Sequence, residues 1–580
     1  MSWIIGVIGK DKDNLKEKIL SLSPETIIEF EENDLFIKSG GNSRTCFFSQ
    51  TENNNERFLA VGVGIEISSK QNTILDSTTW ANFKDLQQIQ ELNGHFVLIR
   101  WNENELKIFT DILGLRDIFI HKYSEGTFIF STRADWLAKI IKPKLDIRQF
   151  GSRWLLFNQI SSKSVFEGIE RVCCGSKIEI NRGNYQLSKT DYKWQPSFQG
   201  SNYSLENFSS TLDNLCLLPF TNNKKISISL SGGMDSRVIL SYLLKSENKN
   251  WDSHTFGDIN HPDSLIANQI SNKLKIPHEQ INLSFPTSID ECLKGIKDYT
   301  SQTIVNNAAS GFIQLRNYNS LSNRNDIIID GGFGEIWRRE FFNRLFITGK
   351  SSLKSKNAKE IIRNLTIHRA DIFNEDVKKI MLDGSIDQIN NVFSELPDME
   401  LIGLENFIDL FALKTRLVNF YSYEQPRLDN IVTSYMPFVQ PILLKNLFNV
   451  SLSQRKNGKL FKNLIEKNFP SLKSFQLAKG ENSYPFRLNT LQSRIWNAAY
   501  KKIGLKLYHE SNSKKLIDLL NPYILDAINS KKVIDSEYYN VPKLNKLSDS
   551  LRKKEMNQND IHEIDWWLAF ELFRESITQE

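Results

Sequence analysis

The stretch 225–240 constrains the fold of this chain more than any other, because a strand, a glycine loop and a helix follow one another without a break. Its first residues, up to Leu230, are β-branched or apolar at alternate positions, which predicts a buried parallel strand. Ser231-Gly232-Gly233-Met234-Asp235-Ser236 follows, and we expect a helix to begin at about Ser236. A strand, a loop and a helix in this order form the repeating unit of a parallel α/β sheet.

The chemistry of this loop favours phosphate. Gly232 and Gly233 let the backbone approach a ligand closely, and the N–H groups at a helix start attract anions. Ser231 and Ser236 add hydroxyl donors, whereas a bare Asp235 carboxylate would repel phosphate and is best explained as an Mg²⁺ ligand. The alternative is a plain strand-to-helix turn with a capping serine. The Gly-Lys-Ser/Thr ending of a Walker A loop is missing, so the loop favours release of pyrophosphate over transfer of a γ-phosphate.

The first 190 or so residues are expected to form a sheet-dominated domain. Short apolar or alternating runs separated by Gly, Asn and Ser predict strands at 3–8, 58–67, 96–101, 106–110, 118–123, 128–131 and 177–181. The stretch 80–92 predicts a helix. A cluster of Pro, Gly and Ser at 194–201 predicts a linker, which divides the chain into domains 1–195 and 196–580.

The second domain has a different pattern. Helical periodicity at 204–218 and 238–244 alternates with strand-like runs at 226–230, 251–256, 279–283 and 326–330. This alternation predicts βαβ units and a parallel sheet. From about residue 353 to the end, the pattern is mainly helical. The last ninety residues contain no motif that indicates a role.

Composition excludes several classes of function. Among 580 residues, Lys plus Arg exceeds Asp plus Glu by 73 − 68 = 5, which is too small a surplus to indicate nucleic-acid binding. The five cysteines have no metal-ligand spacing. No signal peptide and no apolar run of membrane-spanning length occurs. We therefore expect a cytoplasmic protein with neither a nucleic-acid nor a membrane partner.

The loop resembles the pyrophosphate loop of N-type ATP pyrophosphatases, and the downstream sequence resembles their asparagine synthetase-like branch. His254-Thr255-Phe256-Gly257, followed by Asp263, Ala267, Leu274 and His278, is similar to the strand and helix on the adenine side. Asp330-Gly331-Gly332-Phe333-Gly334-Glu335 is similar to the second glycine-rich loop. The resemblance implies ATP and Mg²⁺ as cofactors. ATP would be bound by Ser231, Gly232, Gly233, Asp235, Ser236, Phe256, Gly257, Gly331 and Gly332, and Mg²⁺ by Asp235 and Glu335, where the family usually has an aspartate in place of the glutamate.

The resemblance also suggests catalytic residues. Ala478-Lys479-Gly480 is similar to a lysine–glycine element whose lysine stabilises negative charge during acyl transfer. Lys459 is a weaker candidate. An acid or base near the amine is sought among Tyr421, Tyr423 and Glu424. Met436-Pro437-Phe438 resembles the proline–phenylalanine turn of the family, although Tyr435 and Gln440 replace its usual arginine and acidic flanks.

The N-terminal domain resembles the glutaminase domain of the same family, an N-terminal-nucleophile hydrolase sandwich. Leu92–Phe96, Thr110–Asp117 and Phe166–Arg171 carry the resemblance. The family's catalytic cysteine is replaced by Ser2, and 46–77 offers no match to the residues that hold glutamine. We therefore predict an inactive glutaminase. The expected fold class is an N-terminal hydrolase-like sandwich followed by a parallel-sheet ATP-pyrophosphatase domain with a helical C-terminal part.

These features predict an ATP-dependent synthetase that adenylates a carboxylate and transfers the acyl group to an amine without hydrolysing glutamine. Loss of the cysteine is similar to what is seen in β-lactam synthetases and in lasso-peptide macrolactam synthetases. The resemblance therefore implies a small-molecule or peptide substrate and includes its intramolecular cyclisation. Two alternatives stay open: synthesis of asparagine from aspartate and ammonia, and a catalytically inactive scaffold. The sequence also leaves a homodimer open.

Overall fold

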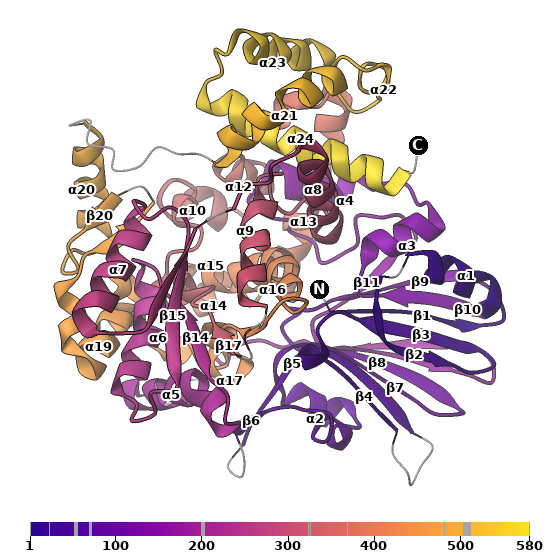
Figure 1. The fold of residues 1–580 in the computed structure, drawn as a ribbon, viewed down its shortest axis with the longest axis horizontal. Helices are drawn as coiled ribbons and strands as arrows, with labels where there is room; N and C mark the ends of the chain where they lie inside the picture. The colour runs from indigo at the N-terminus through magenta and orange to yellow at the C-terminus, as the bar shows by residue number, and fades with distance from the viewer. Residues whose placement is uncertain are drawn as a thin grey trace.

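The computed structural model describes residues 2–22, 24–50, 56–68, 72–198, 204–282, 284–322, 324, 326–367, 369–480, 482–502 and 512–578. Two antiparallel sheets, one parallel sheet and many helices make up a mixed α/β fold (Figure 1). Part of the predicted linker, Gln199-Gly200-Ser201, lies outside the described residues. In the described part of the chain, no helix has both the length and the apolar character needed to cross a bilayer.

The N-terminal half contains the two antiparallel sheets, and strands occur at each position where the sequence predicted one. The first sheet has the order β11 (Glu170–Val172), β9 (Ile118–Ser124), β10 (Thr127–Ser131), β1 (Trp3–Gly9), β3 (Leu35–Gly40) and β2 (Thr26–Glu31). The second has the order β13 (Leu187–Asp191), β12 (Ser176–Asn181), β8 (Glu105–Thr110), β7 (Asn93–Trp101), β5 (Arg57–Ile67) and β4 (Cys46–Gln50), with β6 (Asn72–Ile74) paired to β5.

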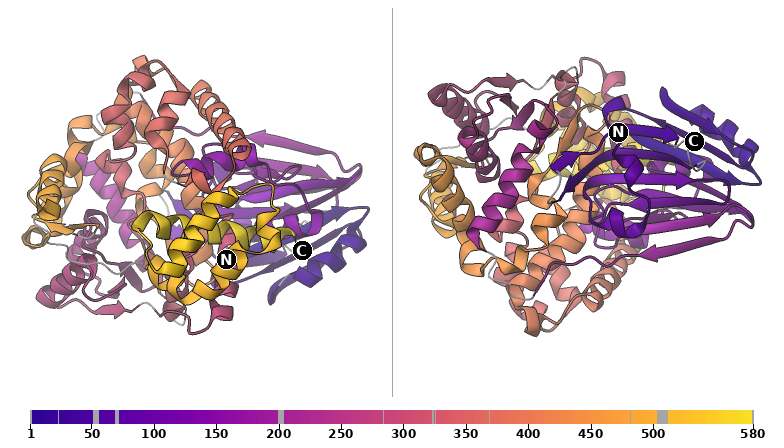
Figure 2. Two further views of the ribbon diagram at one scale, coloured as in Figure 1. Left: turned by 90° about the horizontal axis from the view of Figure 1, so that it is seen from above. Right: turned by 90° about the horizontal axis from the view of Figure 1, so that it is seen from below.

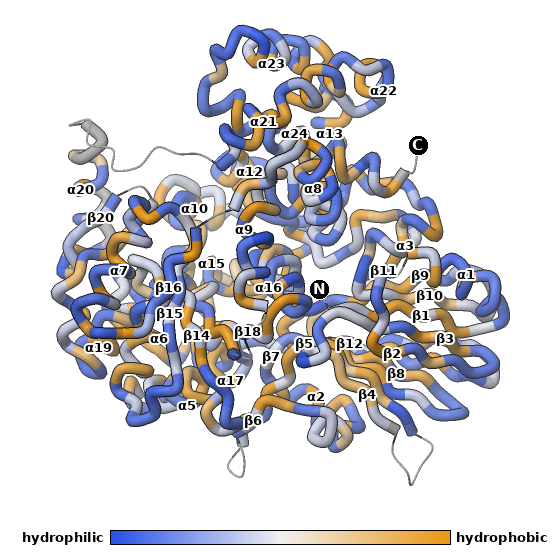
Figure 3. The backbone as a smooth tube through the Cα atoms, in the orientation of Figure 1, coloured by the Kyte–Doolittle hydropathy of each residue, from blue (hydrophilic) through white to orange (hydrophobic). Residues whose placement is uncertain are grey.

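Strand β1 is buried on both faces because it separates two cores. Its side chains alternate, as those of any strand do. Ile4 and Ile8 join a cluster that includes residues of both sheets, whereas Ile5 and Val7 join a cluster that includes Leu15. In Figure 3 the strands of the sandwich are accordingly among the more hydrophobic parts of the backbone. Nearby helices are α1 (Lys12–Leu22), α3 (Ala134–Ile141) and α4 (Ile147–Leu155).

The second half is organised around the parallel sheet. Its order is β16 (His278–Ile281), β15 (Trp251–Phe256), β14 (Ile226–Ser229), β17 (Ile327–Ile329) and β18 (Thr433–Tyr435), and each neighbouring pair is parallel. The carboxyl ends of these strands therefore meet at one edge of the sheet. The surrounding helices in Figure 1 include α5 (Leu205–Thr221), α6 (Met234–Lys245), α7 (Pro262–Leu274) and α19 (Lys459–Asn468).

The helix predicted at 80–92 is interrupted. The structure has a 3-10 turn at Trp80–Asn82 and a short helix α2 at Leu86–Gln90, separated by the extended residue Phe83. Asp85 caps the new helix by accepting a hydrogen bond of 2.9 Å from the Gln88 backbone N–H. Because an aspartate N-cap favours a helix start at its own position, the apolar periodicity alone overestimated the helix.

Residues 512–578 form a helical layer with a defined packing partner, whereas α20 (Thr490–Lys502) lies apart from it, beside β20 (Asn482–Tyr484) (Figure 1). In Figure 2 the helices of the layer lie over the junction between the two halves of the molecule. Phe570 packs against Trp154 of α4 with 5.9 Å between ring centroids. The helices of this layer and those beneath it are α8 (Ile289–Thr303), α13 (Glu375–Glu395), α21 (Asn512–Ile528), α22 (Lys531–Ile534), α23 (Val541–Lys553) and α24 (Gln558–Thr578).

Candidate functional site

The loop Ser231–Ser236 lies at the carboxyl edge of the parallel sheet, between β14 and α6. Helix α6 begins at Met234, two residues earlier than predicted. Its N-cap is Gly233, which provides no side-chain hydrogen bond to the first turn. The first N–H groups of a helix lack intrahelical partners. These donors, together with the positive end of the helix, are therefore available to an anion.

Hydrogen bonds within the loop fix its shape. The Ser236 hydroxyl accepts from the Ser231 N–H at 3.2 Å and contacts the Ser231 hydroxyl at 3.0 Å. The Gly233 N–H donates to the Ser231 hydroxyl at 3.1 Å, and the Gly232 N–H donates to the Asp263 carboxylate at 2.9 Å. The two predicted serines thus act first as supports of the loop, and Asp263 ties it to the start of α7.

The second glycine loop packs directly on the first. It follows β17, the strand next to β14, and Asp330 accepts from the Gly332 N–H at 2.7 Å. A Cβ atom at Gly331 would lie 3.0 Å from the Ser236 nitrogen and 3.1 Å from the Asp235 Cβ. The absence of a side chain at Gly331 therefore allows the two loops to touch. The structure brings together the glycines that the sequence assigned to one site.

Asp235 is engaged by an arginine. Arg338 donates from Nε and Nη2 to the two Asp235 carboxylate oxygens, each at 2.8 Å. A Cβ atom at Gly334 would lie 2.5 Å from the Asp235 Cγ, so the backbone of the second loop covers the carboxylate. Burial, opposed by Arg338 and supported by the nearby Glu335, raises the pKa of Asp235 to about 7.

The residues predicted to bind Mg²⁺ do not fit a directly bound ion in this arrangement. Each carboxylate oxygen of Asp235 already accepts a hydrogen bond from Arg338, and the backbone at Gly334 covers the carboxyl carbon, which leaves little room for the near-octahedral shell that Mg²⁺ requires. Glu335 lies close enough to raise the pKa of Asp235. Within the described ranges, no three His, Cys, Asp or Glu side chains form a group that could hold a metal.

The predicted adenine side is formed by the end of β15. The Phe256 ring packs against Tyr318 with 4.6 Å between centroids and edge-on against His254 at 5.2 Å. Gly257 has a φ of 120°, a conformation that favours glycine. No atom lies within 4 Å of the position that a Cβ at Gly257 would take. Phe256 thus has a packing role, and the backbone beside it faces open space.

Lys479 lies on a hairpin that packs on the loop Ser231–Ser236. The hairpin consists of β19 (Leu477–Lys479) and β20 (Asn482–Tyr484), and the Ala478 N–H donates to the Gly232 carbonyl at 2.8 Å. The Lys479 side chain is 41% exposed, and its Nζ lies 3.8 Å from Glu340 Oε2. A cation on this hairpin is therefore next to the loop and partly free to reorient.

Tyr423 and Glu424 are placed away from the loop. The Tyr423 ring is buried beneath Arg153 and Arg171, whose guanidinium carbons lie 4.4 and 5.4 Å from its centroid. Glu424 accepts a hydrogen bond of 2.6 Å from the Asn307 side chain. The described contacts include none between either residue and 231–236, and their acid–base role near the amine stays a prediction.

The predicted proline–phenylalanine turn is a packing element. Tyr435 ends β18, and its hydroxyl donates to the Leu215 carbonyl at 2.5 Å. The Gln440 side chain accepts from the Gly94 N–H at 2.7 Å. The replacements at Tyr435 and Gln440 thus link the parallel sheet to α5 and to the N-terminal sandwich.

Ser2 is closed off by the second half of the chain. Its side chain is fully buried. The Ser2 hydroxyl contacts the Thr45 hydroxyl at 2.7 Å, donates to the Asp429 carbonyl at 3.2 Å and accepts from the Asn42 N–H at 3.2 Å. These contacts occupy the Ser2 hydroxyl, and the inactive glutaminase stays a prediction.

A buried charge cluster joins the halves beside Ser2. Asp429 contacts His95 Nε2 at 3.0 Å and pairs with Arg116, whose Nη1 also donates to the Ser2 carbonyl at 2.8 Å. Burial alone would raise the pKa of Asp429, but the neighbouring His95 and Arg116 lower it below its ordinary value. The carboxylate is therefore held ionised in the interface.

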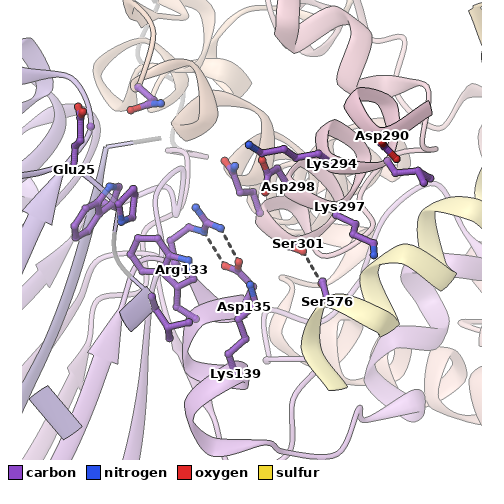
Figure 4. A pocket seen from close by; sticks show the side chains of 18 residues that line it. Glu25, Arg133, Asp135, Lys139, Asp290, Lys294, Lys297, Asp298, Ser301 and Ser576 are labelled. Atoms are coloured by element: carbon purple, nitrogen blue, oxygen red, sulfur yellow. Dashed lines mark hydrogen bonds and ion pairs between the residues drawn. The ribbon is translucent and has the colours of Figure 1, made fainter. Parts of the chain in front are cut away.

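A cavity of about 940 Å³ lies between the sandwich and α8, and none of its lining residues belongs to the loop Ser231–Ser236 (Figure 4). Its lining mixes charges of both signs. Arg133 donates from Nε and Nη2 to the two carboxylate oxygens of Asp135 at 2.7 and 2.6 Å. Lys294 and Asp298 lie on the facing helix α8. The lining contains none of the residues that the sequence assigned to nucleotide binding.

Sequence reasoning missed the cations that organise the loop. Arg338 lies in the turn Gly334–Arg338. Arg237 donates to the carbonyls of Gly232, Phe475 and Gln476 at 3.4, 3.0 and 2.6 Å and so clamps the hairpin segment onto the loop. No local pattern marks either arginine, because the decisive partners are distant in sequence: Asp235 is 103 residues from Arg338, and Phe475 and Gln476 are 238 and 239 residues from Arg237.

The fold and site together define a mixed α/β protein with two glycine-rich loops at the carboxyl edge of a parallel sheet. The chain is similar to the microcin J25-processing protein McjC of Escherichia coli, with 28% identity over 174 residues. The match covers 29% of this chain and 32% of McjC, so it spans about a third of that relative's length. No family model matches the chain.

Two solved structures align weakly with the chain. One is described as the allosteric regulatory enzyme of purine biosynthesis, with 9% identity, a TM-score of 0.23, and coverage of 39% of this chain and 60% of that chain. The other is the glutamine phosphoribosylpyrophosphate amidotransferase of B. subtilis complexed with ADP and GMP, with 12% identity, a TM-score of 0.20, and coverage of 48% and 65%. Such TM-scores support no conclusion about this chain.

Proposed function

We propose that this chain is an ATP-dependent synthetase that adenylates a carboxylate, releases pyrophosphate and transfers the acyl group to an amine without hydrolysing glutamine. One observation carries the proposal: the loop Ser231–Ser236, the second glycine loop and the Lys479 hairpin meet at the carboxyl edge of the parallel sheet. Open α/β sheets bind ligands at this edge, and the N-terminus of α6 is suited to phosphate.

In this proposal, the first-turn N–H groups of α6 hold the phosphates of ATP. A carboxylate oxygen of the substrate attacks the α-phosphorus, and the bond to the leaving pyrophosphate breaks. An amine nitrogen then attacks the acyl carbon, loses a proton and displaces AMP, which forms the amide. Lys479 is the cation placed to offset negative charge during these steps. Holding the amine and the acyl-adenylate together supplies the advantage of proximity.

The proposed source of the amine rests on the buried N-terminal site. The buried Ser2 hydroxyl with its three polar contacts supports an inactive glutaminase, so in this proposal the amine belongs to the substrate or is free ammonia. The similarity to a protein named for processing of microcin J25 supports a peptide substrate in this proposal. The resemblance of the sequence to macrolactam synthetases adds an intramolecular amide. We take the N-terminal sandwich, residues 1–195, to be a structural partner of the synthetase domain, residues 196–580.

The test is pyrophosphate release from MgATP with ammonia present, glutamine absent, and panels of free amino acids and of linear peptides. Release with a peptide, together with a product lighter by one water, supports the proposal. Lys479→Met should reduce the rate by about 10²–10³-fold, whereas the control Lys473→Met, at an exposed position nearby, should not. Stimulation by aspartate alone would identify an asparagine synthetase. Failure to bind ATP would indicate a scaffold.

A further inference from the structure

Asp235 and Arg338 form a bidentate ion pair. Two parallel N–H···O bonds of 2.8 Å join the planar guanidinium to both carboxylate oxygens. The side chains are only 19% and 11% exposed. Arg338 is held from its other side by Glu340, at 2.9 Å between Nη1 and Oε1. Bidentate pairs of this kind are among the stronger charge-assisted contacts in proteins.

The surrounding backbone leaves the carboxylate little freedom to turn away from Arg338. Asp235 packs on Gly331 and Gly334, where added Cβ atoms would lie 3.1 Å from its Cβ and 2.5 Å from its Cγ. A divalent ion at Asp235 would have to displace a guanidinium that is itself fixed by Glu340. Mg²⁺ gives up its own water ligands reluctantly, which makes that exchange unfavourable.

The electrostatic requirement of the site is already met by this pair. A carboxylate in a phosphate loop repels the ligand unless a cation neutralises it. Arg338 supplies that charge within hydrogen-bonding distance. Because a guanidinium has five N–H donors and Arg338 uses three of them on Asp235 and Glu340, two remain for a phosphate oxygen.

We propose that Arg338 is the resident cation of the loop and takes the place of a protein-bound divalent ion at Asp235. The loop then accepts the phosphates of a nucleotide through α6 and Arg338, and any Mg²⁺ is carried by the nucleotide alone. The nucleotide part of this inference rests on the proposed function. The exclusion of metal from Asp235 does not, because it follows from the ion pair itself.

The first experiment is titration with Mn²⁺ alone, followed by electron paramagnetic resonance of the free ion. We expect the wild-type chain and Asp235→Asn to bind Mn²⁺ equally, because Asp235 is not open to metal. Arg338→Met should gain one Mn²⁺ site, and the double variant Arg338→Met/Asp235→Asn should lose it. Wild-type Mn²⁺ binding that disappears in Asp235→Asn would overturn the proposal, and this comparison needs no arginine variant to fold.

The second experiment measures binding of ATP in EDTA and with excess Mg²⁺. Arg338→Met should weaken metal-free binding by about tenfold or more and make binding depend on Mg²⁺. The matched control is Arg133→Met, which removes an equally bidentate arginine from Asp135 in the cavity of Figure 4 and should change neither affinity. If the wild-type chain binds no nucleotide, the proposed function fails, while the Mn²⁺ titration still decides the role of Arg338.

Discussion

The contact between Gly232 and the Lys479 hairpin permits a sharp test of how the loop is built. In Gly232→Ala the new Cβ would lie 2.6 Å from the Ala478 Cβ and 3.3 Å from the Ala478 nitrogen. It would also lie 3.0 Å from the Ile266 Cδ1, but that atom ends a flexible side chain and can move. Since carbon atoms pack best at about 3.5–4.0 Å, the hairpin has to retreat by about 1 Å.

The expected cost combines two unfavourable terms and one term that offsets them. Overpacking of this size destabilises by about 1–3 kcal/mol. Retreat of the hairpin also weakens the 2.8 Å bond from the Ala478 N–H to the Gly232 carbonyl, worth about 0.5–1.5 kcal/mol. The loss of backbone entropy in the unfolded chain offsets about 0.4–1 kcal/mol. We therefore expect the hairpin to be destabilised locally by about 2 kcal/mol.

Hydrogen exchange of the hairpin, followed by mass spectrometry, measures this local term directly. A destabilisation of about 2 kcal/mol corresponds to roughly 30-fold faster exchange of the Ala478 amide. The matched variant is Gly232→Ala/Ala478→Gly, which removes the clashing Cβ. Its exchange should return to that of Ala478→Gly alone. Unchanged exchange in Gly232→Ala, or failure of the second substitution to restore it, would refute the packing argument.

Three further predictions concern the folded state. Burial lowers the pKa of His254 to about 3 from its ordinary 6.5. As the pH falls, the unfolded chain therefore takes up a proton before the folded chain does, and about 2 kcal/mol of stability is lost between pH 6.5 and 5. The melting temperatures of the wild type and His254→Asn should converge over this range. Asp429→Asn leaves the buried Arg116 uncompensated and should cost about 3–5 kcal/mol, seen as a lower melting temperature, whereas Asp387→Asn in an exposed pair should cost under about 1 kcal/mol. Ser2→Cys should release no ammonia from glutamine, and measurable release would show that the site is open.

Part of this protein could be predicted from local sequence alone. Each predicted strand lies where apolar alternation or a β-branched run indicated it, because strand periodicity is a property of consecutive residues. Other strands of the same sheets, among them β2, β3, β4 and β18, were not predicted. The glycine loop at Ser231–Ser236 was equally visible, since its backbone conformation depends on small residues within a few positions. The interrupted helix at 80–92 shows the limit of periodicity, because one cap at Asp85 restarted the helix.

Only the tertiary structure decided which charges meet. Asp235 and Arg338 are 103 residues apart, and Asp429 and Arg116 are 313 apart. A carboxylate in a glycine loop is compatible with a metal or with an arginine, and the sequence contains no information on which cation is within reach. Burial fixes that choice, because an ionised group removed from water requires the partner that the packing places beside it. The sequence thus determined the elements and the loop, whereas the packing of distant segments determined the counter-ion of Asp235 and the closure of Ser2.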